Sequence, residues 1–184
     1  MIPTLDSKTG FLPVGRYPCT EAEIVAQFVD HEDFAGSLTR REIWDHWVAT
    51  RSYLLDRIVA YKVWLGGSFV TAKLDPDDLD VVWTLDAEAA EALSSPQLAA
   101  VAPFISGAQG KEQHGLRIDS YAMFWRSYPL PGGADIEGDS YFRYRGYWDD
   151  FWMRARTGPK DAQPERGDSF PRRGYLEVTF REYA

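Results

Sequence analysis

Residues 64–70 read Trp64-Leu65-Gly66-Gly67-Ser68-Phe69-Val70, and residues 75–82 read Asp75-Pro76-Asp77-Asp78-Leu79-Asp80-Val81-Val82. The first stretch predicts a short buried strand over 62–65 that ends in a tight turn, because paired glycines permit positive φ. The second predicts another strand over 78–85, in which an apolar run follows two acidic residues. The pattern therefore predicts a tight turn close in sequence to two acidic residues at the start of a strand.

The two acids of the second strand are spaced so that their side chains share a face. Residues i and i+2 of a strand point to the same side, so Asp78 and Asp80 project together while Leu79 faces the core. Two like charges so close are unfavourable unless one is protonated or a cation lies between them. Mg²⁺ suits such a pair, because it binds a few carboxylates and completes its shell with phosphate oxygens. Asp77 directly precedes Asp78, which leaves the register of the acidic pair open.

The turn before this strand has the features of an anion site. Gly66 and Gly67 let backbone N–H groups approach an anion closely, and Ser68 adds a hydroxyl donor. A helix starting at Ser68 would favour a triphosphate at its N-terminus, with Lys73 close enough to reach the same phosphates. A Gly-Gly-Ser turn and an Asp-Pro-Asp-Asp loop are each common surface features on their own. Their short spacing between two apolar strands favours a joint nucleotide-binding site.

Asp119 lies near the start of a third predicted strand, over 117–125. If this strand lies beside the 78–85 strand, Asp78, Asp80 and Asp119 converge at one end of the sheet. Three carboxylates can hold two metal ions, which stabilise the attacking and leaving oxygens of an in-line displacement at phosphorus. The alternative is that Asp119 is an ordinary surface acid at a strand end.

The remaining segments alternate between helices and strands. Thr20-Glu21-Ala22-Glu23 has the form of a capping box and predicts a short helix. Apolar residues recur at gaps of three and four over 39–60, which predicts a long amphipathic helix capped by Thr39. Further helices are expected to begin at Asp86, Pro96 and Tyr141, a last strand to cover 174–180, and loops to cover 107–115, 129–138 and 157–172. The pattern predicts a single mixed α/β (α+β) domain over 1–184, with helices flanking a mixed sheet and residues 1–19 as an extended arm.

Composition narrows the class of protein. The 184 residues carry a formal net charge of −8, although basic residues outnumber acidic ones after residue 140. Long DNA is not expected as a partner, because affinity along nucleic acid depends on neutralising phosphates. Cys19 is the only cysteine, which excludes a disulfide framework or a cysteine zinc site and fits a reducing cytoplasm. No apolar run reaches the roughly 18 residues of a membrane span, and the first residues lack the regions of a signal peptide.

Three further features are weaker candidates. Arg172 and Arg173 precede the last strand and could contact a phosphate, although solvated surface charge is the simpler interpretation. His114 lies in a Gly-bounded loop before Asp119, where a solvated histidine is favoured over a role in proton transfer. An aromatic cluster could stack a base, but packing against the core is favoured; it comprises Tyr144, Tyr147, Trp148 and Trp152.

Gly66-Gly67-Ser68 with Asp78-Leu79-Asp80-Val81 resembles the motif of the DNA polymerase β-like nucleotidyltransferase superfamily. That motif is a hydrophobic residue, Gly, and Gly or Ser, followed by an acid-hydrophobic-acid triplet. Residues 64–82 are more closely similar to an uncharacterised bacterial family of small nucleotidyltransferase-like proteins. Members of that family also begin with an Ile-Pro-x-Leu-Asp arm and a Leu-Pro-x-Gly segment, as Ile2–Asp6 and Leu12–Gly15 do here. The superfamily resemblance covers residues 60–125, and the resemblance to the small family covers most of the chain more weakly.

The resemblance implies a role for each residue of the motif. Ser68 and the Gly67 backbone would hold the β- and γ-phosphates of a nucleoside triphosphate, Asp78 and Asp80 would bind two Mg²⁺ ions, and Asp119 would be the third carboxylate, near the acceptor hydroxyl. The implied reaction transfers NMP to a hydroxyl of an RNA end such as that of tRNA, of a protein or of a small molecule.

The biological setting is implied only by the same resemblance. Bacterial relatives in the superfamily include toxins of toxin–antitoxin pairs and antiphage proteins, so a cognate antitoxin or toxin is an expected protein partner. The chain has no obvious helical substrate-binding domain, which leaves the acceptor open. The alternative function is non-catalytic binding, in which the fold serves as an antitoxin, immunity or regulatory partner.

Overall fold

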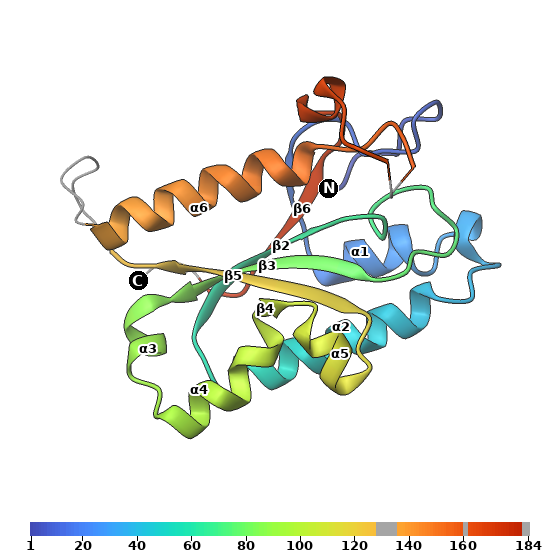
Figure 1. Cartoon of the computed structure of the whole chain (residues 1–184). Helices are drawn as coiled ribbons and strands as arrows, with labels where there is room; N and C mark the ends of the chain where they lie inside the picture. The colour runs from blue at the N-terminus through green and yellow to red at the C-terminus, as the bar shows by residue number, and fades with distance from the viewer. Residues whose placement is uncertain (128–135, 160–161, 182–184) are drawn as a thin grey trace.

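The computed structural model describes residues 1–127, 136–159 and 162–181, and it has helices on both faces of a mixed sheet (Figure 1). The expected mixed α/β class with flanking helices is therefore confirmed. The strands are β1 (Arg16–Pro18), β2 (Ala60–Gly66), β3 (Leu79–Asp86), β4 (Ser106–Gly107), β5 (Ile118–Trp125) and β6 (Tyr175–Thr179). The helices are α1 (Glu21–Phe28), α2 (Arg40–Leu55), α3 (Ala87–Glu91), α4 (Ser95–Val101), α5 (Gln109–His114) and α6 (Ile136–Met153), with 3-10 turns η1 (Glu32–Phe34), η2 (Ala102–Phe104) and η3 (Arg166–Ser169).

The sheet brings three strand ends to one place. Within the described residues the strand order is β1-β6-β2-β3-β5-β4. β2 and β3 are antiparallel, whereas β3 and β5 are parallel neighbours. Parallel neighbours need a crossover connection, which the segment containing α3, α4 and α5 provides on one face. The end of β2 and the starts of β3 and β5 therefore meet at the same end of the sheet.

Two apolar clusters hold the layers together. On one face, α2 packs Trp47 against Trp83 with the ring centroids 5.2 Å apart. On the other face, Trp148 and Trp152 of α6 lie in a buried cluster with Trp64, and Figure 1 shows α6 running along this side of the sheet. Because strand residues alternate, the even-numbered residues of β3 and the odd-numbered residues of β5 face α6. In the described part of the chain, no helix is both long enough and apolar enough to cross a membrane.

The starts of two helices test the capping predictions. Thr20 and Glu23 form the expected capping box at the start of α1. At the start of α2, Thr39 makes no side-chain cap, so that prediction was wrong. The Thr39 hydroxyl instead donates to the Pro76 carbonyl at 2.9 Å, and the Ser37 hydroxyl accepts the Arg40 N–H at 3.2 Å. The start of α2 is thereby tied to the loop between β2 and β3.

Several element boundaries also differ from the prediction. The helix expected over 39–60 ends at Leu55, because the β-branched residues Ile58 and Val59 lead into β2. Ile58 remains buried, so the apolar periodicity continues past the true helix end. The helix expected from Tyr141 begins at Ile136, so residues 136–138 of the loop expected over 129–138 are helical. The rest of that expected loop, 129–135, lies outside the described residues.

The expected extended arm and two of the segments expected as loops contain short elements. The N-terminal arm contributes β1, which pairs with β6, and the 157–172 segment contains η3. The 107–115 segment is not a loop but consists mainly of α5. These elements have few apolar residues, so no hydrophobic periodicity marks them in the sequence.

A buried arginine fixes the loop between β2 and β3. Arg40, in the first turn of α2, is 1% exposed, and its guanidinium lies 3.7 Å from the centre of the Phe34 ring. Burial lowers the pKa of Arg40 to about 10, so the side chain stays charged at neutral pH. It donates five hydrogen bonds of 2.5–3.2 Å, to the carbonyls of Phe28, Phe69, Thr71, Lys73 and Leu74. Because four of these carbonyls belong to residues 69–74, Arg40 organises the path from the Gly-Gly turn to the acidic strand.

Replacing Arg40 by methionine is expected to lower the free energy of unfolding by about 3 kcal/mol or more, because each buried acceptor left without a donor costs about 1–3 kcal/mol. The matched control is Arg41→Met, since Arg41 is exposed and pairs with Asp30 at the surface, an interaction worth about 0–1 kcal/mol. Urea unfolding measures both variants. Equal losses in the two variants would contradict the organising role of Arg40.

Candidate functional site

The acidic residues lie at the end of the sheet where β3 and β5 begin. Asp80 and Asp119 are paired in register on these two strands, and Asp78 directly precedes β3. Neighbouring strands lie about 4.8 Å apart, so the side chains of Asp80 and Asp119 lie beside each other on the face that α6 covers. The prediction that the two acidic strands lie side by side is confirmed.

The Gly-Gly turn lies directly against one of these carboxylates. Gly66 ends β2 and pairs with Asp80 across the antiparallel ladder. Gly67 has a φ of +73°, and a Cβ built on it would lie 1.6 Å from Asp80 Oδ2. The carboxylate thus occupies the space of a side chain at position 67, so both the backbone conformation and this close approach require glycine. At Gly66, a Cβ would lie 3.1 Å from Nε1 of Trp152, so the α6 indole covers this glycine.

The carboxylates are electrostatically coupled. Burial raises the pKa of Asp80 to about 6, with further contributions from the charges of Asp78 and Asp119, while Arg173 and Lys111 act in the opposite direction. A proton or a cation relieves such crowding of like charges. The cluster therefore favours binding of positive charge at neutral pH.

The structure identifies which aspartates form the predicted pair. Asp77 is exposed, and its Oδ2 accepts a hydrogen bond of 2.9 Å from Lys73 Nζ. Asp78 Oδ2 instead accepts a hydrogen bond of 2.6 Å from Lys111 Nζ, and the charge of Asp78 acts on Asp80. Asp78 and Asp80 are thus the converging pair, and Asp77 points away to the surface.

Ser68 does not begin a helix, so the possible helix N-terminus at this turn is absent. Its carbonyl accepts hydrogen bonds from the Thr71 N–H at 3.2 Å and the Thr71 hydroxyl at 2.7 Å, which closes a turn. The path after this turn is fixed by the carbonyl contacts of Arg40 rather than by helical hydrogen bonds. Ser68 and Lys73 nevertheless line the same cavity.

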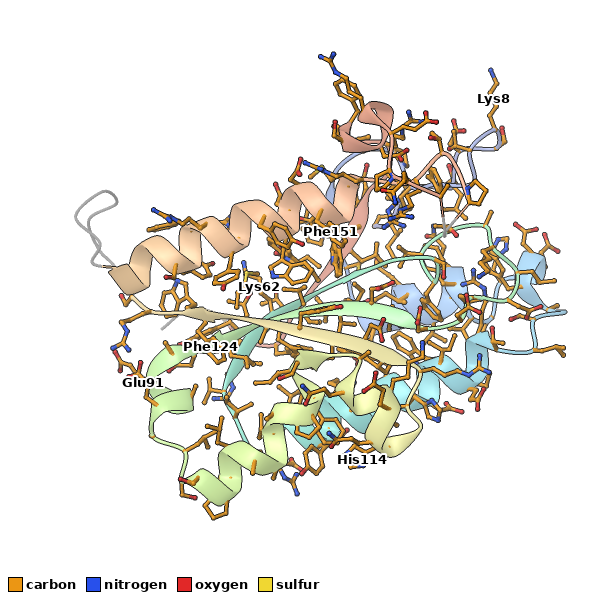
Figure 2. The ribbon with its side chains drawn as sticks, in the orientation of Figure 1. Lys8, Lys62, Glu91, His114, Phe124 and Phe151 are labelled. Carbon is orange, nitrogen blue, oxygen red and sulfur yellow. The ribbon has the colours of Figure 1, made fainter. Side chains whose placement is uncertain are left out.

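This cavity has a volume of about 670 Å³ and lies between the turn, the end of α6 and the segment that follows α6. Figure 2 shows Phe151, one of its lining residues, on the C-terminal part of α6. Basic residues outnumber acidic ones in the lining, so the cavity suits an anion. The charged lining residues are Lys73, Arg154, Arg156, Arg173, Glu165 and Asp168.

Arg173 connects the cavity to the carboxylates. Its Nε donates to the Trp152 carbonyl at 3.1 Å, and its N–H donates to the Met153 carbonyl at 3.1 Å, so it satisfies carbonyls at the end of α6. Burial lowers the pKa of Arg173, and the charge of Asp80 opposes this shift. One guanidinium therefore lines the cavity and interacts with Asp80. Arg172, by contrast, is exposed and donates to the Gly167 carbonyl.

The aromatic residues of α6 and His114 were the other candidates for the site, and they differ in burial. Trp148 and Trp152 are buried against the sheet, as the packing interpretation predicted, whereas Tyr144 and Tyr147 are exposed. His114, labelled at the end of α5 in Figure 2, is exposed and stacks on Phe104 with the rings 5.0 Å apart. The two tryptophans therefore fit the packing interpretation, whereas Tyr144 and Tyr147 do not. His114 is exposed, as expected, but it lies on a helix rather than in a loop.

Sequence reasoning missed two residues that define this site. Lys111 lies in a polar segment without helical periodicity, and only its position a few residues before Asp119 could have indicated it. Arg154 lines the cavity from the end of the α6 segment, and only the excess of arginines after residue 140 pointed in that direction.

The carboxylates of the cluster offer the oxygen donors that Mg²⁺ prefers. As placed, the residues of the described ranges contain no group of three or more His, Cys, Asp or Glu side chains in metal-binding geometry, and Asp78 is engaged by Lys111. Asp80 and Asp119 fit the ion chemically, because they offer adjacent carboxylates whose mutual repulsion a cation would relieve. These two are the residues that would hold a divalent cation.

Comparison with known proteins gives one match. A family model, described as a family of unknown function (DUF6932), matches residues 3–179. Neither the curated proteins nor the solved structures contain a match to the chain.

Gly67→Ala is expected to lower stability much more than Gly115→Ala, which is the matched control. Both glycines have positive φ, but a Cβ at Gly115 meets nothing within 4 Å. The control should therefore cost about 1–2 kcal/mol for the left-handed conformation alone, and Gly67→Ala at least about 2 kcal/mol more for the clash with Asp80.

Comparing Gly67→Ala with Gly115→Ala in a protein that also carries Asp80→Ala removes the clash between the added methyl group and the Asp80 carboxylate. The nearest remaining atom is then Asp80 Cβ, 3.2 Å from the added methyl group, so Gly67→Ala should cost about as much as the control. Urea unfolding of all the variants provides the test, and a penalty at Gly67 that persists without the carboxylate would contradict this account.

Asp80→Asn is expected to remove a pH dependence of stability. The pKa of Asp80 is raised to about 6 in the folded state, from a model-peptide value of 3.8. Between these pH values the folded state retains a proton that the unfolded state has lost. The contribution of Asp80 to the free energy of unfolding is therefore complete below about pH 4 and is lost as the pH rises through 6. The decline should be on the order of 3 kcal/mol in the wild type and absent in the variant.

Urea unfolding from pH 4 to 7, without divalent cations, measures this difference. Asp45→Asn, a change at an exposed position on α2, should keep the wild-type dependence. Parallel profiles for the wild type and Asp80→Asn would show that the Asp80 carboxyl is not perturbed.

Proposed function

The chain belongs to this family of unknown function, and we propose that it is a metal-dependent nucleotidyltransferase that moves NMP from a nucleoside triphosphate to a hydroxyl acceptor. The observation that carries the proposal is the in-register placement of Asp80 and Asp119 beside the Gly67 turn. Acidic side chains on adjacent strands, next to a tight turn, suit displacement at phosphorus.

The basic cavity supports binding of the triphosphate. Ser68, Lys73 and Arg173 line it, and Arg173 also interacts with Asp80. A guanidinium presents a planar fork of donors that matches two phosphate oxygens. In this arrangement the α-phosphate lies near Asp80 and the β- and γ-phosphates extend into the cavity.

In the proposed reaction, Asp80 and Asp119 share the metal ion, and Asp119 also accepts a proton. Mg²⁺ held by Asp80 and Asp119, when bound, would neutralise the triphosphate and polarise the α-phosphoryl group. The acceptor oxygen forms a bond to the α-phosphorus, and the bond from that phosphorus to the bridging oxygen breaks. Pyrophosphate leaves with the electron pair, and the hydroxyl proton passes to the Asp119 carboxylate and then to water.

The acceptor belongs to one of three classes: an RNA end such as that of tRNA, a protein, or a small molecule. The net charge of −8 favours these compact acceptors over long DNA, because an acidic surface repels an extended phosphate backbone. The proposal places the reaction in the cytoplasm. A role in a toxin–antitoxin pair or in antiviral defence, with a cognate protein partner, is included by resemblance only.

Two measurements test the proposal in order. Calorimetric titration with non-hydrolysable ATP and GTP analogues, with and without Mg²⁺, should show metal-dependent binding, which Arg173→Gln weakens by about tenfold or more because a charge-assisted hydrogen bond is lost. NTPs labelled at the α-phosphate are then incubated with tRNA, with protein and with a small-molecule extract.

Asp80→Asn and Asp119→Asn should each lower the transfer rate by about a thousandfold, since each removes a group that acts at the reacting phosphorus. Asp45→Asn is the matched control and should retain wild-type transfer. Full activity in Asp80→Asn would refute the mechanism. Metal-dependent binding without transfer to any of the three acceptor classes would favour the non-catalytic binding function.

A further inference from the structure

Lys111 is a cation that belongs to the carboxylate cluster. It lies in the middle of α5, the short helix before β5, and its Nζ is 2.6 Å from Asp78 Oδ2. Its charge also acts on Asp80 and Asp119. Lys111 therefore contacts one predicted metal-binding carboxylate directly and influences the other two.

Close backbone contacts hold the short helix in this position. A Cβ at Gly110 would lie 3.1 Å from the Pro103 carbonyl, so α5 packs tightly on the preceding 3-10 turn. Gly115 caps the helix with a φ of +66°, and its N–H donates to the Lys111 carbonyl at 3.0 Å. The backbone at Lys111 is thus fixed, and only its stem needs to extend toward Asp78.

The charges around the cluster limit how many metal ions it can accept. When ionised, Asp78, Asp80 and Asp119 carry three negative charges, and Lys111 and Arg173 carry two positive charges beside them. The charge of Asp77 also acts on Lys111, but Asp77 is paired with Lys73, so that pair adds no net charge. One divalent cation brings this group to a single positive charge. A second would leave three positive charges together before any substrate binds, which is strongly unfavourable at such short separations.

The positions of the three carboxylates also favour a single metal ion. Asp80 and Asp119 lie side by side in register, so they can share one ion without Asp78. An ion bridging Asp78 and Asp80 would have to compete with the ammonium that already binds Asp78 Oδ2. An ammonium has three donors, so Lys111 can serve Asp78 and a phosphate oxygen together.

We propose that Lys111 takes the place of one of the two cations, so that the cluster binds a single divalent ion between Asp80 and Asp119. Lys111 positions Asp78 and supplies the second positive charge of the site. The inference rests on the proposed function, because it requires that the carboxylates bind a metal.

Counting bound Mn²⁺ tests the inference without turnover. Free Mn²⁺ is followed by electron paramagnetic resonance at neutral pH, without nucleotide, as each protein is titrated. The wild type is expected to bind one ion and Lys111→Met two, whereas Lys111→Arg keeps the charge and should bind one. Asp80→Asn gives the number of ions bound elsewhere, which is subtracted.

The matched control is Lys8→Met, which makes the same substitution and the same change in net charge. Figure 2 shows Lys8 on a loop on the opposite side of the sheet from α5, whose last residue is the labelled His114. This variant should bind one ion, so a count of two in Lys111→Met would not reflect net charge alone.

The results separate this inference from the function on which it rests. Two ions in the wild type, or one in Lys111→Met, would overturn the role of Lys111 and leave the proposed function standing. No specific binding in the wild type or in any variant would also overturn the inference, because the carboxylates would then hold no ion without nucleotide. The proposed function would still be decided by the transfer assay with labelled NTPs.

Discussion

The guanidinium of Arg40 is the contact on which the site depends. The chain between β2 and β3 forms neither helix nor strand, so its buried carbonyls have no ladder to satisfy them. Arg40 meets this need with its five N–H donors, each bonded to a carbonyl, four of them in residues 69–74. Once this segment is fixed, the turn at Gly67 is held against Asp80. Without these hydrogen bonds from Arg40, residues 69–74 would regain the conformational freedom typical of a long surface loop.

The register of the strands then places the carboxylates beside the fixed turn. The antiparallel ladder sets Gly66 opposite Asp80 on one side, and the parallel ladder sets Asp119 opposite Asp80 on the other. A shift of one residue in either ladder would turn these side chains to the opposite face, so the site is specified by the same alternation that specifies the core. The repulsion among the carboxylates is tolerated because the apolar packing of Trp64 and Val82 beneath α6 holds the strands in register.

The sequence was most informative where a local pattern is sufficient. Alternation in the strand predicted that Asp78 and Asp80 share a face, and the shared strand end predicted that Asp119 joins them.

Arg40 could not be predicted, because a charged residue at a helix start is normally solvated and only the folded loop supplies its carbonyls. Lys111 was missed because its six-residue helix has no apolar periodicity, and the surroundings of Arg173 depend on how the end of α6 packs on the sheet. The two glycines were predicted correctly as a turn, but the demand for glycine at position 67 comes from Asp80, which lies beyond the turn itself.

Segments outside the motif also contribute to the carboxylate cluster and to the cavity beside it. In the plane of the sheet, Asp80 is flanked by Gly66 and Asp119, and Trp152 of α6 covers Gly66. The neighbouring cavity, which Ser68 lines, has walls from the segment after α6 and from Phe11 of the N-terminal arm. The cations come from the same outlying parts, Lys111 from the crossover before β5 and Arg173 from the residues before β6. The arm and the C-terminal segment therefore supply walls of the cavity, and the crossover and the C-terminal segment supply positive charges that act on Asp80.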